Sequence, residues 1–430
     1  MRPTISPVTT SDVFPSTTTV VIIGGGIVGL TAALTLAERK IPVVVLEKGQ
    51  IAGEQSSRNL GWIRKTSRLA EDIPLAQASD RLWAEMNARV QSDVGYRKSG
   101  IMFTTRTDTQ MAGYEHWFNG IKGLNLDSRL LSSREISNLV PHGNTQWAGG
   151  VYTPSDGCAE PTLASSAIAK AAISKGAIII ENCAVRTLTF SAGEVSGVVT
   201  EKGEIKCDRV LLAGGLWSRR FLGNLNVNLP TLPLICSVLR TTPMKGPTDI
   251  SLGAPDFSFR KHRDGGFIIT QRGALRAPLT LDHLLIGMRY LKQLRGQGGF
   301  LRLSVGQYGL KDFSLARRWR GQQTSPFEKM RIMDPETDHA LNNEAIENLK
   351  TAWPIFSKLE IANAWAGVID VTPDSNPVIG AIDQIPGLFI ASGFSGHGFG
   401  TSPAAGQLAA DLVSNQTPIV DPEPYRFNRF

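Results

Sequence analysis

The residues Val20-Val-Ile-Ile-Gly-Gly-Gly-Ile-Val-Gly29 place a strand, a glycine-rich turn and the start of a helix in direct succession. The β-branched run at their beginning is typical of a strand that is buried on both faces. The helical pattern continues to Arg39, with Ala32 and Leu36 on one apolar face. A second β-branched run, Val43-Val-Val-Leu46, then follows. This order predicts a βαβ unit, and therefore a parallel sheet flanked by helices.

The glycine spacing in the turn predicts a dinucleotide site. Gly24 makes the tight turn, Gly26 lets backbone N–H groups approach a pyrophosphate, and Gly29 lets the helix pack on the strand. The helix start, with Ile27 and Val28, offers free N–H groups and a favourable dipole to phosphates. The alternative is a glycine-tolerant turn in an α/β protein that binds no nucleotide.

An acidic residue ends the second strand. Glu47 follows Gly29 by 18 residues. A carboxylate in this place accepts hydrogen bonds from both ribose hydroxyls and disfavours a 2′-phosphate. We include the neighbouring Lys48 in the predicted site. Both NAD and FAD satisfy this pattern.

The composition limits the class of protein. The chain has 430 residues, of which 42% are hydrophobic and 19% charged, so it can bury a large core and is neither disordered nor fibrous. The net charge of +7 favours anionic ligands or a membrane surface. Four scattered cysteines and six scattered histidines predict neither a disulfide scaffold nor a metal site. We expect a reducing, cytoplasmic location, with residues 1–18 as a loose arm.

Two later segments favour FAD. Val210-Leu-Leu-Ala-Gly-Gly-Leu-Trp217 resembles the second glycine turn of FAD enzymes of the glutathione-reductase type. Pro373 to Gly380, followed by the glycine-rich run Gly387 to Gly400, resembles a flavin-covering C-terminal segment. From about residue 20 to 425 the chain is therefore similar to the D-amino-acid oxidase (DAO) superfamily, which includes glycine oxidase, sarcosine oxidase and the D-amino-acid dehydrogenases.

The resemblance implies an α/β fold with two lobes. A glutathione-reductase-type Rossmann domain that binds FAD would comprise residues 19–75, 150–228 and 363–430. An inserted α+β substrate domain with a mixed sheet would comprise residues 76–149 and 229–362. None of the four cysteines falls near the family's covalent attachment region, so we expect non-covalent FAD.

The resemblance also assigns further residues to the cofactor. The predicted contacts after the glycine turn are Ser56, Ser57, Arg58, Asn59, Leu60, Gly61, Val185, Ala213, Gly214, Trp217, Gly367, Gly393, Gly396, His397, Gly398, Phe399 and Gly400. An ordinary polar loop at 52–64 and a plain core valine at 185 are the alternatives. We expect a closing helix from Ala404 to Val413, with Ser402 as its cap and Pro403 at its first position.

The reaction implied is oxidation of a C–N bond in a small amino or imino acid. Hydride passes from Cα to the flavin and leaves an imine. Arg64 and Arg272 are the candidates to bind the substrate carboxylate, with Arg64 favoured over Arg272, and His397 is placed at the flavin or in the substrate site. A salt bridge at the surface or between the lobes is the alternative for each arginine.

Three shorter motifs concern the subgroup. Ser325 to Glu328, Arg331 to Pro335 and Trp365 to Asp370 look most like bacterial dehydrogenases and oxidases of D-amino acids, hydroxyproline or pipecolate. The electron acceptor is left open between oxygen, a quinone and a carrier protein, and the assembly between homo- and hetero-oligomer. The rival functions are an electron-transferring flavin subunit of a hetero-oligomer and an NAD-binding module without flavin.

A basic stretch lies between Leu281 and Arg320. Its cations alternate with leucines, and Leu284, Met288 and Leu291 have helical spacing. One interpretation is an amphipathic element that meets a partner or the inner membrane surface. The favoured interpretation is a helix of the inserted lobe with a solvated basic face. No nucleic-acid-binding module is recognised.

Overall fold

A six-stranded sheet forms the first of two large sheets in the computed structural model, which describes residues 2–290 and 301–430. The strand order is β20-β21-β12-β1-β2-β8, and all neighbours are parallel except β20 and β21. The strands are β1 (Val20–Ile23), β2 (Val43–Leu46), β8 (Ile178–Ile180), β12 (Arg209–Leu212), β20 (Val378–Ala381) and β21 (Leu388–Ser392). Three separated parts of the chain therefore build one sheet.

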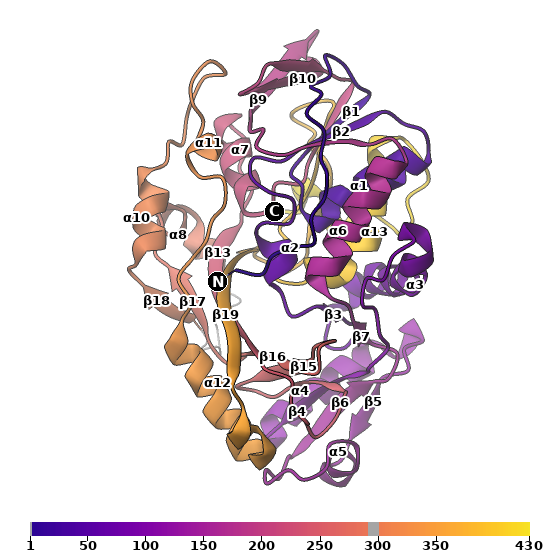
Figure 1. Cartoon of the computed structure of the whole chain (residues 1–430), viewed down its shortest axis with the longest axis vertical. Coiled ribbons are helices and arrows are strands. Elements are labelled where there is room, and N and C mark those ends of the chain that lie inside the picture. Colours follow the sequence, from indigo (N-terminus) through magenta and orange to yellow (C-terminus); the bar gives the residue numbers. More distant parts are fainter. Residues whose placement is uncertain (1, 291–300) are drawn as a thin grey trace.

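The two faces of this sheet have different covers. Val20 and Ile22 face a core formed with the helices, whereas Val21 and Val44 face a second core. The helices on the first face are α1 (Ile27–Glu38), α6 (Pro161–Ser174) and α13 (Gly398–Val413) (Figure 1). The second core includes side chains of the meander β9 (Val185–Ser191), β10 (Glu194–Thr200) and β11 (Glu204–Lys206).

A ten-stranded mixed sheet forms the second lobe, in the lower part of Figure 1. Its path is β18 (Leu301–Ser304), β17 (Leu275–Pro278), β13 (Leu232–Thr241), β16 (Phe267–Thr270), β15 (Ser258–Lys261), β14 (Ser251–Gly253), β4 (Ile101–Thr105), β6 (Gly149–Thr153) and β5 (Arg129–Leu131), with β19 (Ile361–Val371) paired to β13. β14 and β4 run parallel and join the two inserted segments. The predicted fold class, an α/β cofactor domain with an inserted mixed-sheet domain, is confirmed.

The rest of the described chain forms a small strand pair, further helices and the N-terminal arm. A small antiparallel pair, β3 (Trp62–Ile63) and β7 (Gly157–Cys158), lies beside them. The other α-helices in the part of the chain that the structure describes are α2 (Gln55–Arg58), α3 (Ile73–Val90), α4 (Asp108–Gly120), α5 (Ser133–Leu139), α7 (Ser218–Asn224), α8 (Leu281–Ile286), α10 (Gln307–Ser314), α11 (Pro326–Lys329) and α12 (His339–Ala352). In the N-terminal arm, Ser11 N donates to Ile179 O at 2.8 Å and Thr18 N donates to Lys206 O at 2.9 Å.

The basic stretch differs from the favoured expectation. α8 has six residues and is followed by a single 3-10 turn, Gly287–Tyr290. Leu284 and Met288 are 76% and 79% exposed, so their side chains do not pack into the lobe. Leu291, Lys292, Arg295 and Phe300, which also belong to that prediction, lie outside the described residues. Among the helices that the structure describes, none has the length and hydropathy needed to cross a membrane.

Candidate functional site

The glycine turn leaves no room for side chains where two backbones meet. Gly24 has a φ of +113°, and a Cβ on it would lie 2.4 Å from Ala213 O. A Cβ on Gly29 would lie 2.3 Å from Gly24 O. Gly26 is different, because its Cβ would meet only Ser56 Oγ at 3.3 Å. Gly24 and Gly29 therefore allow neighbouring backbone segments to pack closely, and Gly26 leaves the start of α1 without a side chain.

Backbone N–H groups hold the carboxylate at the end of β2. Gly25 N donates to Glu47 Oε2 at 2.8 Å, and Gly49 N donates to Glu47 Oε1 at 2.7 Å. Burial raises the pKa of Glu47, while Lys48 and these two donors act in the opposite direction. The carboxylate is thus fixed in direction at the edge of the parallel sheet.

The loop that follows β2 folds over the start of α1. Ser56 Oγ accepts a hydrogen bond from Ile27 N at 2.9 Å, so α2 supplies the cap that Gly26 lacks. Arg58 donates to Asp334 at 2.8 Å and to Ala366 O at 2.9 Å, which ties this loop to β19. The Arg58 guanidinium therefore joins chain segments.

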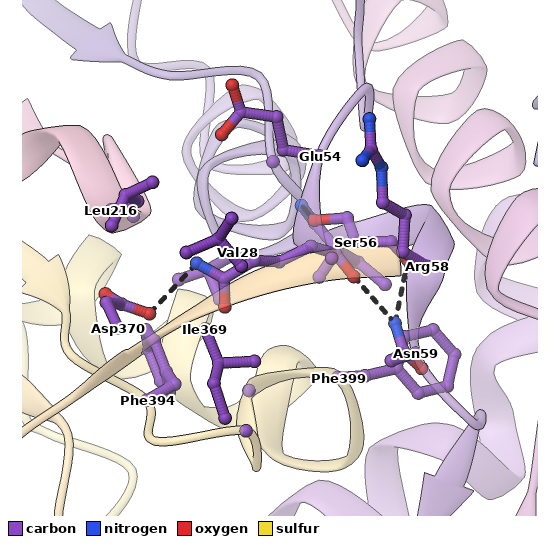
Figure 2. A pocket seen from close by; sticks show the side chains of 18 of the residues that line it. Val28, Glu54, Ser56, Arg58, Asn59, Leu216, Ile369, Asp370, Phe394 and Phe399 are labelled. Atoms are coloured by element: carbon purple, nitrogen blue, oxygen red, sulfur yellow. Dashed lines mark hydrogen bonds between the residues drawn. The ribbon is translucent and has the colours of Figure 1, made fainter. Parts of the chain in front are cut away.

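A cavity of about 440 Å³ begins at this turn and extends toward the second lobe. This volume is in the range of small-molecule and cofactor sites. Figure 2 shows Asp370 and Asn59, with their hydrogen bonds, among the side chains that line it. Gln55 donates to Asp370 at 2.9 Å, and Asn59 donates to Gln55 O and Ser56 O.

Most of the predicted site residues lie at this cavity. The ones that line it are Gly24, Gly26, Ile27, Val28, Glu47, Lys48, Ser56, Arg58, Asn59, Leu60, Arg64, Val185, Ala213, Gly214, Trp217, Arg272, Gly367, Gly396, His397, Gly398, Phe399 and Gly400. Gly29, Ser57, Gly61 and Gly393 are not among the lining residues. Gly61 and Gly393 have positive φ angles, and Gly393 N donates to Asp370 at 2.8 Å.

The closing helix begins earlier than the sequence predicts. α13 starts at Gly398, and Pro403 lies inside it, so Ser402 is not its cap. Pro403 has no N–H to donate to Phe399 O, and Ser402 Oγ donates to that carbonyl instead, at 2.8 Å. Ser79 and Trp83 of α3 donate to Gly400 O at 2.8 and 2.9 Å. These side-chain donors allow the helix to extend through the proline.

Two arginines meet at the end of the cavity nearest the second lobe. Arg64 Cζ lies 5.5 Å from the centroid of the Phe103 ring, and Arg272 Cζ lies 4.2 Å from the same centroid. Arg64 also donates to His397 Nε2 at 2.9 Å. Arg272 donates to Ala254 O at 3.1 Å. The structure thus brings together the three side chains predicted for the substrate site.

Burial, together with the neighbouring positive charges, keeps His397 neutral. Burial, followed by Arg64 and Arg68, lowers the pKa of His397 well below its usual value. Because Arg64 can only donate, His397 Nε2 is the acceptor and its ring proton is on Nδ1. Burial and the nearby Arg68 and Arg272 lower the pKa of Arg64 to about 9, so Arg64 remains protonated at neutral pH.

Several lining residues were missed by the sequence predictions. Glu54 accepts from Trp217 Nε1 at 3.0 Å and from Met333 N at 2.9 Å, which fixes one wall. Phe103 lies on β4, far along the chain from the glycine turn, and no local pattern distinguishes it. Asp370 closes the predicted motif Trp365 to Asp370 and lies within β19, directly after the β-branched pair Val368 and Ile369, which was the available signal.

The residues fit a dinucleotide cofactor. The turn has a helix start without a side chain at Gly26, an oriented carboxylate at Glu47 and a cavity that continues past both. Among the residues described, no cluster of three His, Cys, Asp or Glu side chains is placed to hold a metal ion.

Comparison with known proteins gives one family and two kinds of relative. The model of the family described as DAO, FAD dependent oxidoreductase, matches residues 19–412. Mitochondrial sarcosine dehydrogenase from Mus musculus is 25% identical over 98% of this chain, and the match spans 42% of that enzyme. The chain therefore spans less than half the length of this relative. Sarcosine oxidase subunit beta from Rhodobacter capsulatus is 22% identical, over 92% of this chain and 84% of the relative.

Two solved structures have a higher sequence identity to this chain than the two relatives above. The structure of L-amino acid deaminase from Proteus myxofaciens in complex with anthranilate is 32% identical, with a TM-score of 0.95, and covers 100% of this chain and 97% of its own. L-amino acid deaminase from Proteus vulgaris is 31% identical, with a TM-score of 0.93, over 98% of this chain and 100% of its own.

Proposed function

The chain belongs to the DAO family of FAD dependent oxidoreductases, and on this premise we propose that it oxidises the C–N bond of a small amino or cyclic imino acid. One observation carries the proposal. Arg64 and Arg272 enter the cavity from two chain segments, and neither has an anionic partner among residues 2–290 and 301–430. A substrate carboxylate is the group that pairs best with such a guanidinium.

The cofactor of the family is FAD, and we assign its binding to the first lobe. The start of α1 at Gly26 would receive the pyrophosphate, and Glu47 would receive the ribose hydroxyls. The glycines at the start of α13 would lie against the ring, held without a covalent bond. When bound, FAD supplies the redox chemistry by taking up the hydride that leaves Cα.

The chain itself contributes binding, orientation and exclusion of water. Arg64 holds the substrate carboxylate in a fixed direction, because its guanidinium can donate two parallel hydrogen bonds. His397 is neutral and holds Arg64 through Nε2. Phe103, Trp62 and Phe399 line the same cavity and limit access of water. Such orientation is the main contribution that a protein makes to a cofactor reaction.

The relatives widen the set of substrates to test. The motifs in the sequence favour D-amino acids, hydroxyproline or pipecolate, whereas the two structural relatives above 30% identity are named for L-amino acids. Anthranilate, the ligand in one of them, is itself an amine with an adjacent carboxylate. The panel should therefore contain both enantiomers of linear and cyclic amino acids.

Anaerobic bleaching of the purified yellow protein tests the proposal. We expect at least one amino or imino acid to remove the flavin absorption near 450 nm in the absence of oxygen. Re-oxidation by oxygen or by a quinone then separates an oxidase from a dehydrogenase. If no member of the panel bleaches a protein that retains FAD, the proposal is wrong.

A second function has specific support. Two relatives are named as sarcosine oxidase subunit beta, and a third as a regulatory subunit of pyruvate dehydrogenase phosphatase. In this alternative the chain carries flavin for electron transfer and depends on partner chains for substrate chemistry. Activity of the chain purified alone would exclude it.

We also propose a division of the chain and a surface that meets the membrane. Residues 19–75, 150–228 and 363–430 would form the FAD domain, and residues 76–149 and 229–362 the substrate domain. On this division β6 and β19 would lie mostly in FAD-domain segments while they pair with strands of the second sheet. The 281–313 face is defined as Leu284, Leu285, Met288, Leu310 and Phe313 with Arg289 and Lys311. These exposed residues belong to α8, the 3-10 turn that follows it, and α10, at the left of Figure 1. Exposed apolar side chains among cations are typical of peripheral membrane contact.

A further inference from the structure

Cations that line the cavity fall into two groups. Four of them have carboxylate partners: Lys48 with Glu54, Arg58 with Asp334, Arg68 with Asp72, and Arg331 with Glu201. Arg64 and Arg272 have none in the described part of the chain. Their hydrogen bonds are to neutral groups, namely Thr66 O and His397 for Arg64 and Ala254 O for Arg272.

The two unpaired guanidiniums lie close together. Both contact the same ring, that of Phe103, at 5.5 and 4.2 Å from its centroid. A further donor belongs to a lining residue, because Trp62 Nε1 is buried and has no hydrogen-bond partner within residues 2–290 and 301–430. Two neighbouring positive charges and a buried donor favour the binding of an anion with several acceptor atoms. The corner therefore fits a ligand that brings more than one group of acceptors.

A single carboxylate satisfies only part of this arrangement. One bidentate pair neutralises one guanidinium and leaves the other without an anion. Two carboxylates neutralise both and still leave oxygen lone pairs for Trp62. Repulsion from Arg272 also affects the pKa of Arg64. Burial, Arg68 and Arg272 together lower this pKa to about 9.

We propose that the substrate carries two carboxylates and is thus an amino or imino dicarboxylate. This inference rests on the proposed function and narrows its substrate class. Arg64 holds the carboxylate beside the reacting carbon, since it contacts His397 at the start of α13. Arg272, two residues after the end of β16, holds the second carboxylate and selects the substrate.

Binding of unreactive acids to the FAD-loaded protein tests the inference without turnover. Malonate, succinate and glutarate are compared with acetate, propionate and butyrate by the change in flavin absorption at constant ionic strength. We expect at least one dicarboxylate to bind about tenfold more tightly than its monocarboxylate counterpart. The Arg272→Met variant should lose this difference while monocarboxylate affinity stays within about twofold.

Two further variants make the result specific. Arg276→Met is the matched control, because Arg276 lies on β17, pairs with Asp338 and does not line the cavity. It should keep the full preference. If Arg272→Met does not retain FAD, Arg272→Lys is used instead. It keeps the positive charge but lacks the planar pair of donors of a guanidinium, so it should show a reduced preference for dicarboxylates.

Several outcomes would overturn the inference. One is equal affinity for mono- and dicarboxylates in the unmodified protein. Another is a preference that persists in both Arg64→Met and Arg272→Met. A third is an Arg64→Met variant with unchanged acid binding and a shifted flavin midpoint potential, which would assign Arg64 to the cofactor.

The proposed function and the inference fail separately. Suppose that glutamine bleaches the flavin at a lower concentration than glutamate, and asparagine at a lower concentration than aspartate. The proposed oxidation is then supported, and the inference of a dicarboxylate substrate is wrong. If no amino acid bleaches it and the dicarboxylate preference is present, the binding corner stands and the oxidation is wrong.

Discussion

Glu47 is a single carboxylate on which the affinity for FAD should depend. Its two backbone bonds keep the side chain folded against the turn, so Glu47→Gln should leave the protein folded. Loss of a charged hydrogen bond to ribose costs about 1.5–3 kcal/mol, which weakens FAD by roughly ten- to a hundredfold. Reconstitution of the apoprotein, followed by flavin fluorescence, measures the change. Glu194→Gln on the exposed hairpin is the control, and equal affinity in both variants would contradict the role of Glu47.

His397 gives a pH dependence of stability whose sign follows from its surroundings. Burial, Arg64 and Arg68 lower its pKa in the folded protein, whereas the unfolded chain binds the proton near pH 6.5. Between these two pKa values the unfolded state binds more protons, so the free energy of unfolding rises with pH and becomes level above about 6.5.

The difference between two proteins isolates this effect. Thermal unfolding from pH 5 to 8 is measured for the unmodified protein and for His397→Asn, both loaded with FAD. We expect the difference in melting temperature to grow with pH up to about 6.5 and then to remain constant. A constant difference over the whole range would show that His397 is not held neutral in the fold.

Residues of the site differ in how far the sequence could predict them. Gly24, Gly26 and Glu47 act within one βαβ unit, so their spacing alone indicated their positions. Phe103 reaches the cavity from β4 through the packing of two sheets, and local spacing carries no information about such a contact. The same limit applies to the pairing of Arg64 with His397, which are 333 residues apart.

At the scale of elements, α13 depends on a serine that replaces a missing backbone donor. Ser402→Ala would leave Phe399 O without its 2.8 Å hydrogen bond, at a cost of about 1–2 kcal/mol in the free energy of unfolding. In a Pro403→Ala background the new N–H can reach that carbonyl, so the same change should cost less. Denaturant unfolding of the four proteins gives the coupling between the two positions.

A serine in an ordinary helix provides the comparison. Ser166 of α6 donates to Thr162 O at 2.8 Å in a helix without an internal proline. Ser166→Ala should therefore change the free energy of unfolding by less than Ser402→Ala does. Equal costs for Ser402→Ala with and without Pro403 would mean that the serine does not substitute for the proline.

The start of α13 also shows why element boundaries were mispredicted. Ser402-Pro403 has the local form of a helix start, because proline favours the first turn. The helix extends back to Gly398 because α3 supplies two side-chain donors to Gly400 O. Strands such as β1 and β2 were predicted with their observed bounds. A continuous run of β-branched residues indicates a buried strand from the local sequence alone.

At the scale of the whole molecule, the class of fold was predictable and the arrangement of the second sheet was not. The repeated glycine turns indicated that separated segments share one parallel sheet. The parallel pairing of β14 with β4 joins residues about 150 positions apart, and no turn or spacing marks it. Exposure of the basic stretch is also a property of the assembled surface, because a helical pattern does not reveal whether a neighbouring element covers its apolar side.

That exposure leads to a prediction about the 281–313 face. Leu284, Leu285 and Met288 are between 62% and 79% exposed, and the nearby carboxylates of Asp282 and Asp312 are paired with arginines. The surface therefore presents apolar side chains together with Arg289 and Lys311, which have no carboxylate partner in the part of the chain that the structure describes. This combination binds anionic lipid. We expect the FAD-loaded protein to sediment with vesicles that contain phosphatidylserine at low salt. High salt should release it, because screening removes about 1 kcal/mol for each basic residue near the surface.

Paired substitutions distinguish this face from general electrostatic adsorption. Leu284→Asp with Met288→Asp removes apolar side chains and adds negative charge on the face, and should abolish sedimentation while flavin content is unchanged. Phe190→Asp replaces another exposed side chain, on β9, and should sediment as the unmodified protein does. Equal sedimentation of both variants would assign the binding to net charge alone. If the unmodified protein stays in the supernatant at low salt but forms dimers that the double variant does not, the face is an interface between chains and the membrane assignment is wrong.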